Sequence, residues 1–357
     1  MRRDLLHILL VIFTSSLILL PLLGIAAAMG LPEYILKPIV LVILGVLSIS
    51  LIAAGILSVP DLFARLRERR FLNAALDGRV ATIESLLRKG VSPNASDSGR
   101  VTALVKASMR GHVLVVKALL KARANVNIAA KDGGTPLHGA VLGVWTERSS
   151  RETACTIVDS LLASGADPNM QMAGSETALG LAAGLGLSEV VASLLRAGAN
   201  PNSGAPLVGA PLIAALSNNH ETVVEMLIQA GADPNAVVRE SAPRPGTLSG
   251  TYAEQLKGTT GFTLKDFKGF TPLMFASVNG NANVVTRLIQ AGADVNRHTA
   301  DNMTALMAAA QGGYSSCVRL LLAAGADKAI QHSGSGLTAR EIALRSGHSE
   351  CERMLVA

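Results

Sequence analysis

Histidine and cysteine supply much of the acid–base, nucleophilic and metal-ligating chemistry of proteins, and this chain of 357 residues has seven histidines and three cysteines. The cysteines (Cys155, Cys317 and Cys351) do not have the spacing of metal ligands, and their odd number is compatible with a reducing compartment. Three histidines (His112, His220 and His348) recur at one place in a repeated pattern, ten residues after its opening residue. We therefore predict no catalytic site, no cofactor and no metal site, and do not expect an enzyme.

The repeated pattern is clearest from Thr271 to Asn296, where Thr271-Pro272-Leu273-Met274 precedes a small residue, a glycine, two apolar pairs and a Gly-Ala-Asp. A second copy opens with the tetrad Thr135-Pro136-Leu137-His138, the full form of the motif. The opening position recurs at Arg69, Thr102, Thr135, Thr177, Ala210, Thr271, Thr304 and Thr338, with steps of 33, 33, 42, 33, 61, 33 and 34 residues.

Each position in the pattern has a structural reason. Threonine caps a helix N-terminus and proline fits the first helical residue. Gly280 and Gly292 provide the left-handed backbone that ends helices. The apolar pairs fall on one face of a second helix. The pattern therefore predicts a helix–turn–helix followed by an extended loop, in units that must stack because one unit cannot bury its apolar face.

A period of 33 with this opening resembles the ankyrin-repeat family, over about eight units that cover residues 69–357. The resemblance implies an all-α solenoid over residues 71–357, and a binding function through the first helices and the finger loops that join the units. The first unit keeps the register without the tetrad. The last unit, Thr338–Ala357, has the charges of a terminal repeat that faces water.

Two insertions interrupt the register. The first adds nine residues near 144–153 and contains Trp145, the only tryptophan, and Arg148. It is either a lengthened helix or loop at the surface or a binding anchor, since Trp and Arg are enriched in binding hot spots. The second adds 28 residues near 236–269, and its aromatic residues make it either a partner contact or a flap on its own stack. The aromatic residues concerned are Tyr252, Phe262, Phe267 and Phe270.

The N-terminal region has a different composition. Residues 5–29 and 39–59 are apolar stretches long enough to span a bilayer, and a short turn joins them. We therefore predict a transmembrane hairpin over residues 1–60. The alternative for residues 1–29 is a cleaved signal peptide, although the apolar part is longer than usual for one. No acidic or basic residue lies deep in either span, which argues against an ion path.

Basic residues set the expected orientation. Arg2 and Arg3 precede the first span, and four arginines follow the second in the junction 61–70 (Arg65, Arg67, Arg69 and Arg70). Both termini and the repeats are therefore expected on the cytoplasmic side. The junction is either simply a helix that leads into the first repeat or an interfacial helix that contacts anionic headgroups, and these interpretations are compatible.

Composition narrows the class of function. The formal net charge is +6, of which residues 1–70 contribute +3, so the repeats are nearly neutral for their size and nucleic-acid binding is not favoured. The predicted function is a membrane-anchored scaffold that holds a protein partner near the bilayer, with no small-molecule substrate. The alternatives are a regulatory or assembly subunit of a membrane complex and, less favoured by the apolar spans, a transport element formed by oligomerised hairpins.

Overall fold

The computed structural model describes residues 59–173, 176–204, 210–238 and 268–356. The two expected membrane spans fall almost wholly in residues 1–58, outside the described residues. Within the described part, no helix is both long and apolar enough to cross a bilayer. Phe71–Ala357 forms one compact unit, separate from Met1–Arg70, and this unit contains the repeats.

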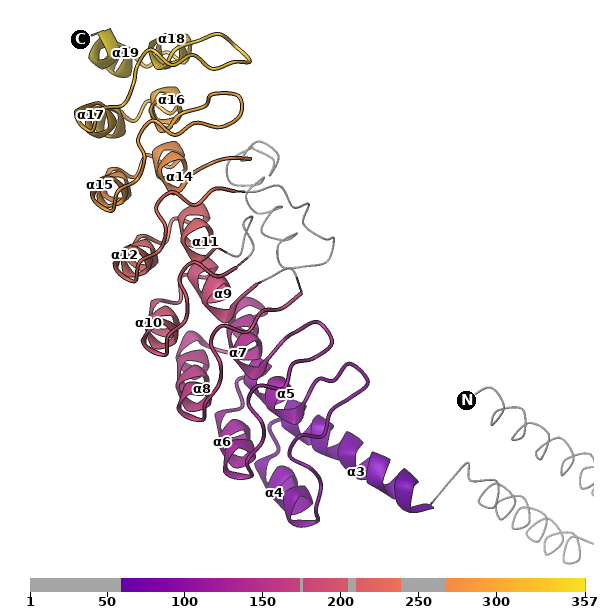
Figure 1. Ribbon diagram of the computed structural model, residues 1–357. Helices are drawn as coiled ribbons and strands as arrows, with labels where there is room; N and C mark the ends of the chain where they lie inside the picture. The colour runs from indigo at the N-terminus through magenta and orange to yellow at the C-terminus, as the bar shows by residue number, and fades with distance from the viewer. Residues whose placement is uncertain (1–58, 174–175, 205–209, 239–267, 357) are drawn as a thin grey trace, which may run out of the picture. The chain divides into compact units, whose positions relative to one another are not determined.

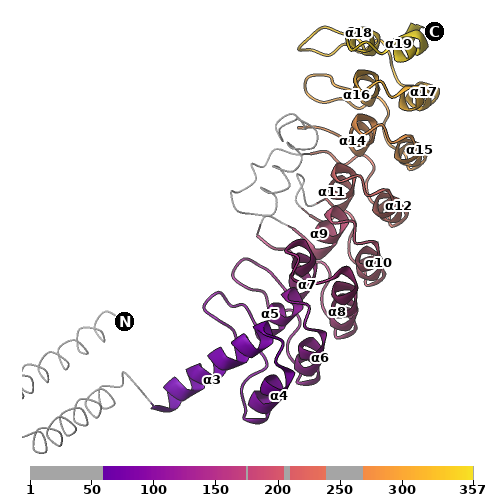
Figure 2. The same cartoon turned by 180° about the vertical axis from the view of Figure 1, so that it is seen from behind.

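The repeat unit consists of paired helices in two layers (Figure 1). The first helices lie side by side in one layer and the second helices in the other, as the opposite view also shows (Figure 2). The first helices are α3 (Val59–Leu76), α5 (Ala103–Met109), α7 (Pro136–Trp145), α9 (Ala178–Gly184), α11 (Pro211–Ser217), α14 (Pro272–Val278), α16 (Ala305–Gln311) and α18 (Ala339–Arg345). The second helices are α4 (Val80–Arg88), α6 (Val113–Lys121), α8 (Arg151–Ala163), α10 (Ser188–Arg196), α12 (Glu221–Gln229), α15 (Ala282–Gln290), α17 (Ser315–Ala323) and α19 (Ser349–Val356). The predicted all-helical solenoid is confirmed.

First helices begin directly after the opening residues that the pattern identifies. In five of them the threonine hydroxyl accepts a hydrogen bond from the backbone N–H three residues on, as in Thr102 with Val105 at 3.3 Å. The first unit differs, because α3 starts at Val59 and runs through Arg69 without a break. Arg69 therefore marks the register of the first unit without opening a helix, and the junction 61–70 is helical and continues into the first repeat.

Finger loops between the repeats share one closing pattern. In the loop before α16, Thr299 N–H donates to Met303 O at 3.1 Å and Asn302 N–H donates to Thr299 O at 3.0 Å. The corresponding bonds before α14 join Val238 to Phe270 at 3.1 Å and Gly269 to Val238 at 2.9 Å. Asn302 and Gly269 both have left-handed backbone, with φ of 63° and 82°. The second insertion therefore replaces only the two tip residues of an ordinary finger loop, and both of its ends are fixed.

A row of asparagines links successive repeats. Asn202, for example, accepts from Asp233 N–H at 2.7 Å and donates to Gly231 O at 3.0 Å in the next repeat. Equivalent bonds are made by Asn127, Asn169, Asn235 and Asn296, and Ala329 occupies the same position in the last loop. The row keeps the repeats in register along the whole described stack.

The core is a continuous band of aliphatic and small side chains between the two layers. It depends on close helix approach at α5 and α7, where a Cβ atom added to Gly143 would lie 2.3 Å from the carbonyl oxygen of Met109. One added at Gly139 would lie 3.1 Å from that of Val105. Small residues at these two positions let α7 pack directly on the backbone of α5.

Candidate partner-binding surface

We compare the fourth, seventh and eighth positions counted from the start of each first helix. In α5 these are Lys106, Met109 and Arg110, all partly exposed. In the five first helices that follow α5 the fourth position is buried, and the seventh and eighth positions are accessible except at Gly143 and Gly184. In these five helices the three positions carry no charged residue. We call this set the inner stripe: Gly139, Leu142, Gly143, Leu181, Gly184, Leu185, Ala214, Ser217, Asn218, Phe275, Val278, Asn279, Ala308, Gln311 and Gly312.

Polar side chains at the centre of the inner stripe are hydrogen-bonded within the stack. Ser217 Oγ donates to Ile213 O at 2.9 Å, and Asn218 Nδ2 donates to Ala214 O at 3.2 Å. Asn279 Nδ2 donates to Leu216 O, the last buried carbonyl of the neighbouring first helix, at 3.0 Å. Each amide keeps a second N–H and its oxygen, so the centre of the stripe combines uncharged polar groups with apolar contact through Leu142, Leu185 and Val278, which are partly exposed.

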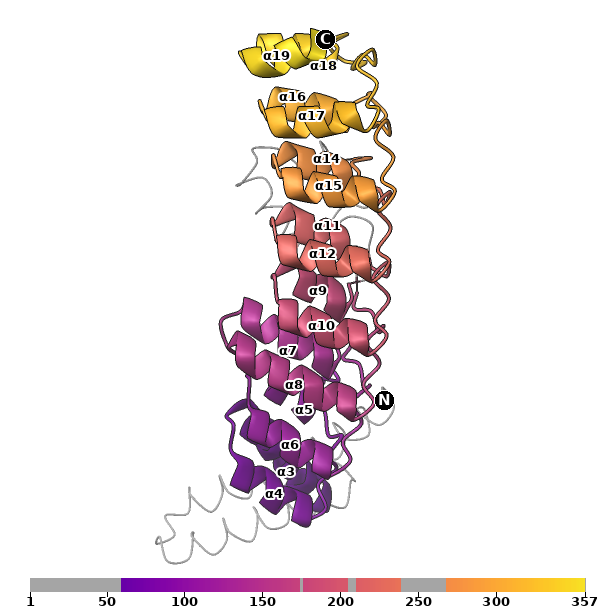
Figure 3. The same ribbon diagram turned by 90° about the vertical axis from the view of Figure 1, so that its left-hand side faces the viewer.

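The first insertion lengthens both helices of its repeat. α7 has 10 residues against 7 in α5, and α8 has 13 against 9 in α6. The intervening turn lies at the edge of the stack (Figure 3). In this turn Arg148 is exposed, and its Nη1 lies 3.7 Å from the sulfur atom of Met109 on α5. Trp145, the last residue of α7, is partly exposed.

We call Met109, Arg110 and Arg148 the basic patch. Neither Arg110 nor Arg148 forms an ion pair with any residue in the described ranges. Lys106, one turn before Arg110, is paired with Asp97 at 2.8 Å. Burial works to raise the pKa of Asp97, but hydrogen bonds from Lys106 and from the backbone outweigh it, and the pKa lies below its usual value. The two arginines are thus the unneutralised charges at this end of the inner stripe.

The aromatic residues of the second insertion divide into two groups. Tyr252, Phe262 and Phe267 lie outside the described residues. Phe270 is buried and packs edge-to-face on Phe275 of α14, with ring centroids 5.6 Å apart. Phe270 belongs to the core of the stack and is not available as an exposed partner anchor, because it closes the base of the finger loop. The sequence could have shown this, since Phe270 directly precedes the opening residue Thr271.

The recurring histidines have a structural role. In His112, His220 and His348, Nε2 lies 3.0, 3.1 and 3.1 Å from a carbonyl oxygen. In each case this oxygen belongs to the last residue of the first helix of the preceding repeat. His138, in the tetrad, contacts the hydroxyl of Thr135 through Nδ1 at 2.8 Å and Glu176 O of the next repeat through Nε2 at 3.3 Å. Its burial lowers the pKa to about 4, against the opposing effect of the Glu176 carbonyl.

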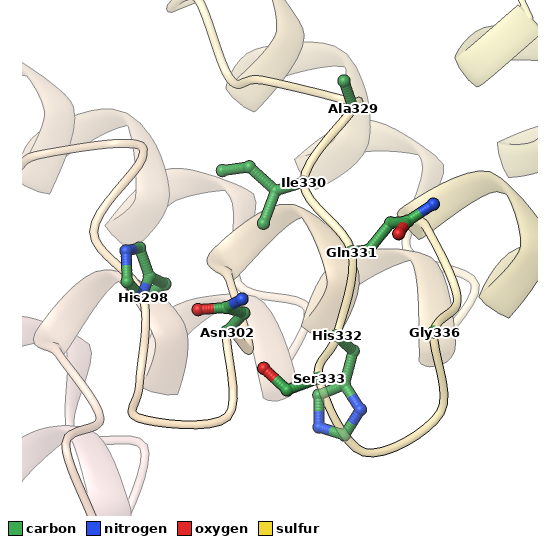
Figure 4. Close-up of a pocket in the computed structure, with 8 residues that line it drawn as sticks. All are labelled: His298, Asn302, Ala329, Ile330, Gln331, His332, Ser333 and Gly336. Carbon is green, nitrogen blue, oxygen red and sulfur yellow. The ribbon is translucent and has the colours of Figure 1, made fainter.

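A shallow hollow of about 520 Å³ lies between the last two finger loops. Figure 4 shows His298 and Asn302 from one loop and Gln331 and His332 from the next. Beside it, His332 Nε2 lies 3.1 Å from the Asp301 carboxylate. Hydrogen bonds from Thr299 and His332 hold the pKa of Asp301 below its usual value. Sequence reasoning missed this pair, which joins residues of different repeats, although the spacing of 31 residues was a usable signal.

The four junction arginines lie on α3, and each of them is exposed: Arg65, Arg67, Arg69 and Arg70. Two apolar side chains on the same helix are also exposed, Phe63 by 58% and Leu66 by 50%. The N-terminal part of α3 is therefore a helix with apolar and basic side chains both accessible.

Paired helices in stacked units define a solenoid, a class that generally binds other proteins. A family model described as ankyrin repeats (3 copies) matches residues 71–144, 148–237, 251–332 and 273–357. The chain belongs to the ankyrin-repeat family.

Relatives and solved structures are similar over the repeats. The crystal structure of the human ASB11 ankyrin repeat domain has a TM-score of 0.51 and 26% identity, and the match covers 72% of this chain and 99% of that one. Zinc finger CCCH domain-containing protein 50 of Oryza sativa subsp. japonica is 48% identical over 75 residues, 19% of this chain and 11% of that protein. Ankyrin repeat-containing protein P1E11.10 of Schizosaccharomyces pombe is 38% identical over 64 residues, 18% of this chain and 31% of that protein. The match thus spans less than a third of either curated relative.

Proposed function

We propose that this chain is a membrane-tethered scaffold that holds a protein partner at the cytoplasmic surface of a bilayer. The repeats supply the binding surface, and residues 1–60 supply the tether. The single observation that carries the binding role is the inner stripe, because its accessible members, at the seventh and eighth positions of five successive first helices, carry no charge. Ankyrin repeats generally bind proteins, and the step from the family to this chain rests on that surface.

The tether is supported by the sequence and by α3. The stretches 5–29 and 39–59 have the length and composition of membrane spans. Exposed Phe63 and Leu66 beside exposed arginines have the composition of a helix that lies at a lipid interface. Each basic residue near an anionic leaflet contributes about 1 kcal/mol to binding. Arg65, Arg67, Arg69 and Arg70 together would therefore favour the cytoplasmic side.

Two measurements test the proposal separately. Carbonate extraction of native membranes should leave the full chain in the pellet, whereas a variant lacking residues 1–58 should be released. Affinity purification from detergent-solubilised native membranes, with mass spectrometry, should identify a protein retained by the full chain. Replacement of residues 239–268 by Ala-Asp, which keeps the loop-closing Val238 and Gly269, shows whether the second insertion contributes. Release of the full chain by carbonate would contradict the proposed tether. If neither the full chain nor the variant without the second insertion retained a protein, the scaffold role would be contradicted.

A further inference from the structure

The inner stripe and the basic patch together describe the chemistry of the segment that would bind there. The stripe begins at α7 and ends at α16, and its central polar side chains are already hydrogen-bonded to backbone carbonyls. A charged partner residue placed over it would lose water without gaining a counter-charge, which is unfavourable. The stripe therefore selects an uncharged, largely apolar segment.

The N-terminal end of the stripe has the opposite character. Arg110 is the eighth-position residue of α5, and Arg148 reaches from the neighbouring repeat to the Met109 side chain beside it. Nε of Arg110 is buried and has no acceptor among the residues that the structure describes. The Nε atom itself is shielded from solvent, but both guanidinium groups lack an ion-pair partner in the described part of the chain, and a carboxylate is the acceptor that a guanidinium binds best. Glu147, the acidic residue of the same turn, is exposed and forms no ion pair with either arginine in the described ranges.

The first insertion explains why the unpaired positive charge is confined to this end of the inner stripe. Ser149 packs against Gly111, where an added Cβ would lie 2.7 Å from Ser149 Oγ, and Gly143 allows α7 to touch the end of α5. The lengthened turn is therefore held against the C-terminal end of α5 by two glycines. This contact places Arg148 and Met109 together, and the shorter turns of the other described repeats have no equivalent of Arg148.

We propose that the inner stripe binds an apolar segment of a partner protein whose one end carries carboxylates, and that this acidic end lies on the basic patch. The inference rests on the proposed scaffold function and adds the composition and direction of the bound segment. The acidic end lies toward α5 and the apolar part runs toward α16. Arg345, exposed at the far end on α18, is preceded by Glu341, so that end has no comparable excess of positive charge.

The test is selection of a random peptide display library on the immobilised full-length chain in neutral detergent. Selected peptides should contain an acidic cluster next to an apolar run. The affinity of a synthetic selected peptide should fall at least about tenfold with Arg110→Glu plus Arg148→Glu, and it should weaken with added salt. Leu185→Glu, in the middle of the stripe, should weaken the same peptide by a similar factor. Circular dichroism of each variant verifies that it is folded.

A matched control makes the same change of charge on the second-helix layer, with Lys117→Glu on α6 plus Arg319→Glu on α17, both exposed. This control should leave peptide affinity unchanged. Selected peptides without acidic residues, or peptides as sensitive to the control as to the patch variant, would overturn the inference and leave the scaffold function standing. Failure to select any peptide would count against both. Loss of binding to anionic vesicles in the patch variant, without loss of peptide binding, would instead assign the arginines to lipid.

Discussion

The side-chain amide of Asn235 donates to the carbonyl oxygen of Gly292 at 3.0 Å, across 57 residues of sequence. Its Oδ1 accepts from Asp294 N–H at 2.8 Å. The same two bonds join Asn202 to the next repeat across about 30 residues. The second insertion therefore leaves the stack in register, and the repeats on either side of it form a single solenoid.

Removal of the second insertion should preserve the fold. Replacing residues 239–268 by Ala-Asp, the residues at 300–301 of the neighbouring finger loop, would leave Val238, Gly269 and Phe270 to close a loop of ordinary length. We expect the urea midpoint of the full-length variant, followed by circular dichroism, to stay close to that of the parent. A large loss of helicity would show that residues 239–268 are needed for folding.

The asparagine row should contribute measurably where it crosses the insertion. Asn235→Ala removes two inter-repeat hydrogen bonds, each with a net contribution of roughly 0.5–1.5 kcal/mol, so a loss of about 1–3 kcal/mol is expected in urea unfolding. Ala329→Asn is the control, because Ala329 occupies the same position in the last finger loop. Equal effects of the two substitutions would contradict the role of the row.

The repeat register was predictable because it depends on local chemistry. Threonine caps, left-handed glycines and paired aliphatic residues act within a few residues of each other, and they fixed the start of α5, α9, α14, α16 and α18. The repeat period alone does not show where α3 begins, because α3 starts before the first repeat, but the junction sequence indicated a helix that leads into that repeat.

The candidate surface was only partly predictable. Trp145 and Arg148 were visible as an unusual insertion, but the contact of Arg148 with Met109 depends on how closely α7 approaches α5. Phe270 was grouped with the other aromatic residues of the insertion, and only its place directly before Thr271 separates this buried residue from them. The inner stripe is recognised only when equivalent helix positions are aligned across the repeats. This alignment requires the start of each helix, which its cap defines.

Gly143 should be intolerant of any side chain. Gly143→Ala would place Cβ 2.3 Å from the carbonyl oxygen of Met109, so α5 and α7 would have to separate. Overpacking of this kind costs about 1–3 kcal/mol, and the loss should appear as a lower urea midpoint. Gly139→Ala is the graded comparison, because its contact of 3.1 Å with Val105 O needs a smaller shift. A larger loss at Gly139 than at Gly143 would contradict the packing described.

His138 should make stability depend on pH. Burial lowers its pKa to about 4 in the folded chain, whereas the unfolded value is 6.5, so the unfolded state binds more protons between these values. Its contribution is fully present above pH 6.5 and is lost as the pH falls from 6.5 toward 4. The loss is about 3 kcal/mol at the acidic limit, at about 1.4 kcal/mol per pH unit.

The matched variant for this titration is His138→Met, since Met274 occupies the same position of the tetrad in another repeat. Urea unfolding of the parent and the variant at several pH values between 4 and 7 gives the comparison. The parent should lose more stability than the variant over this range. Parallel curves would show that His138 is protonated as easily in the folded chain as in the unfolded one.

The three cysteines should differ in reactivity because only Cys155 is partly exposed, whereas Cys317 and Cys351 are buried between helix layers. Burial raises the pKa of Cys317 to about 11, and burial also raises the pKa of Cys351, so both thiols are shielded and weakly ionised. Maleimide labelling of the native full-length chain, with peptide mapping, should modify Cys155 first. Unfolding in urea should make all three reactive. Early labelling of Cys317 or Cys351 would mean that α17 and α19 separate from the stack under native conditions, and the C-terminal repeat would then be less stable than its packing indicates.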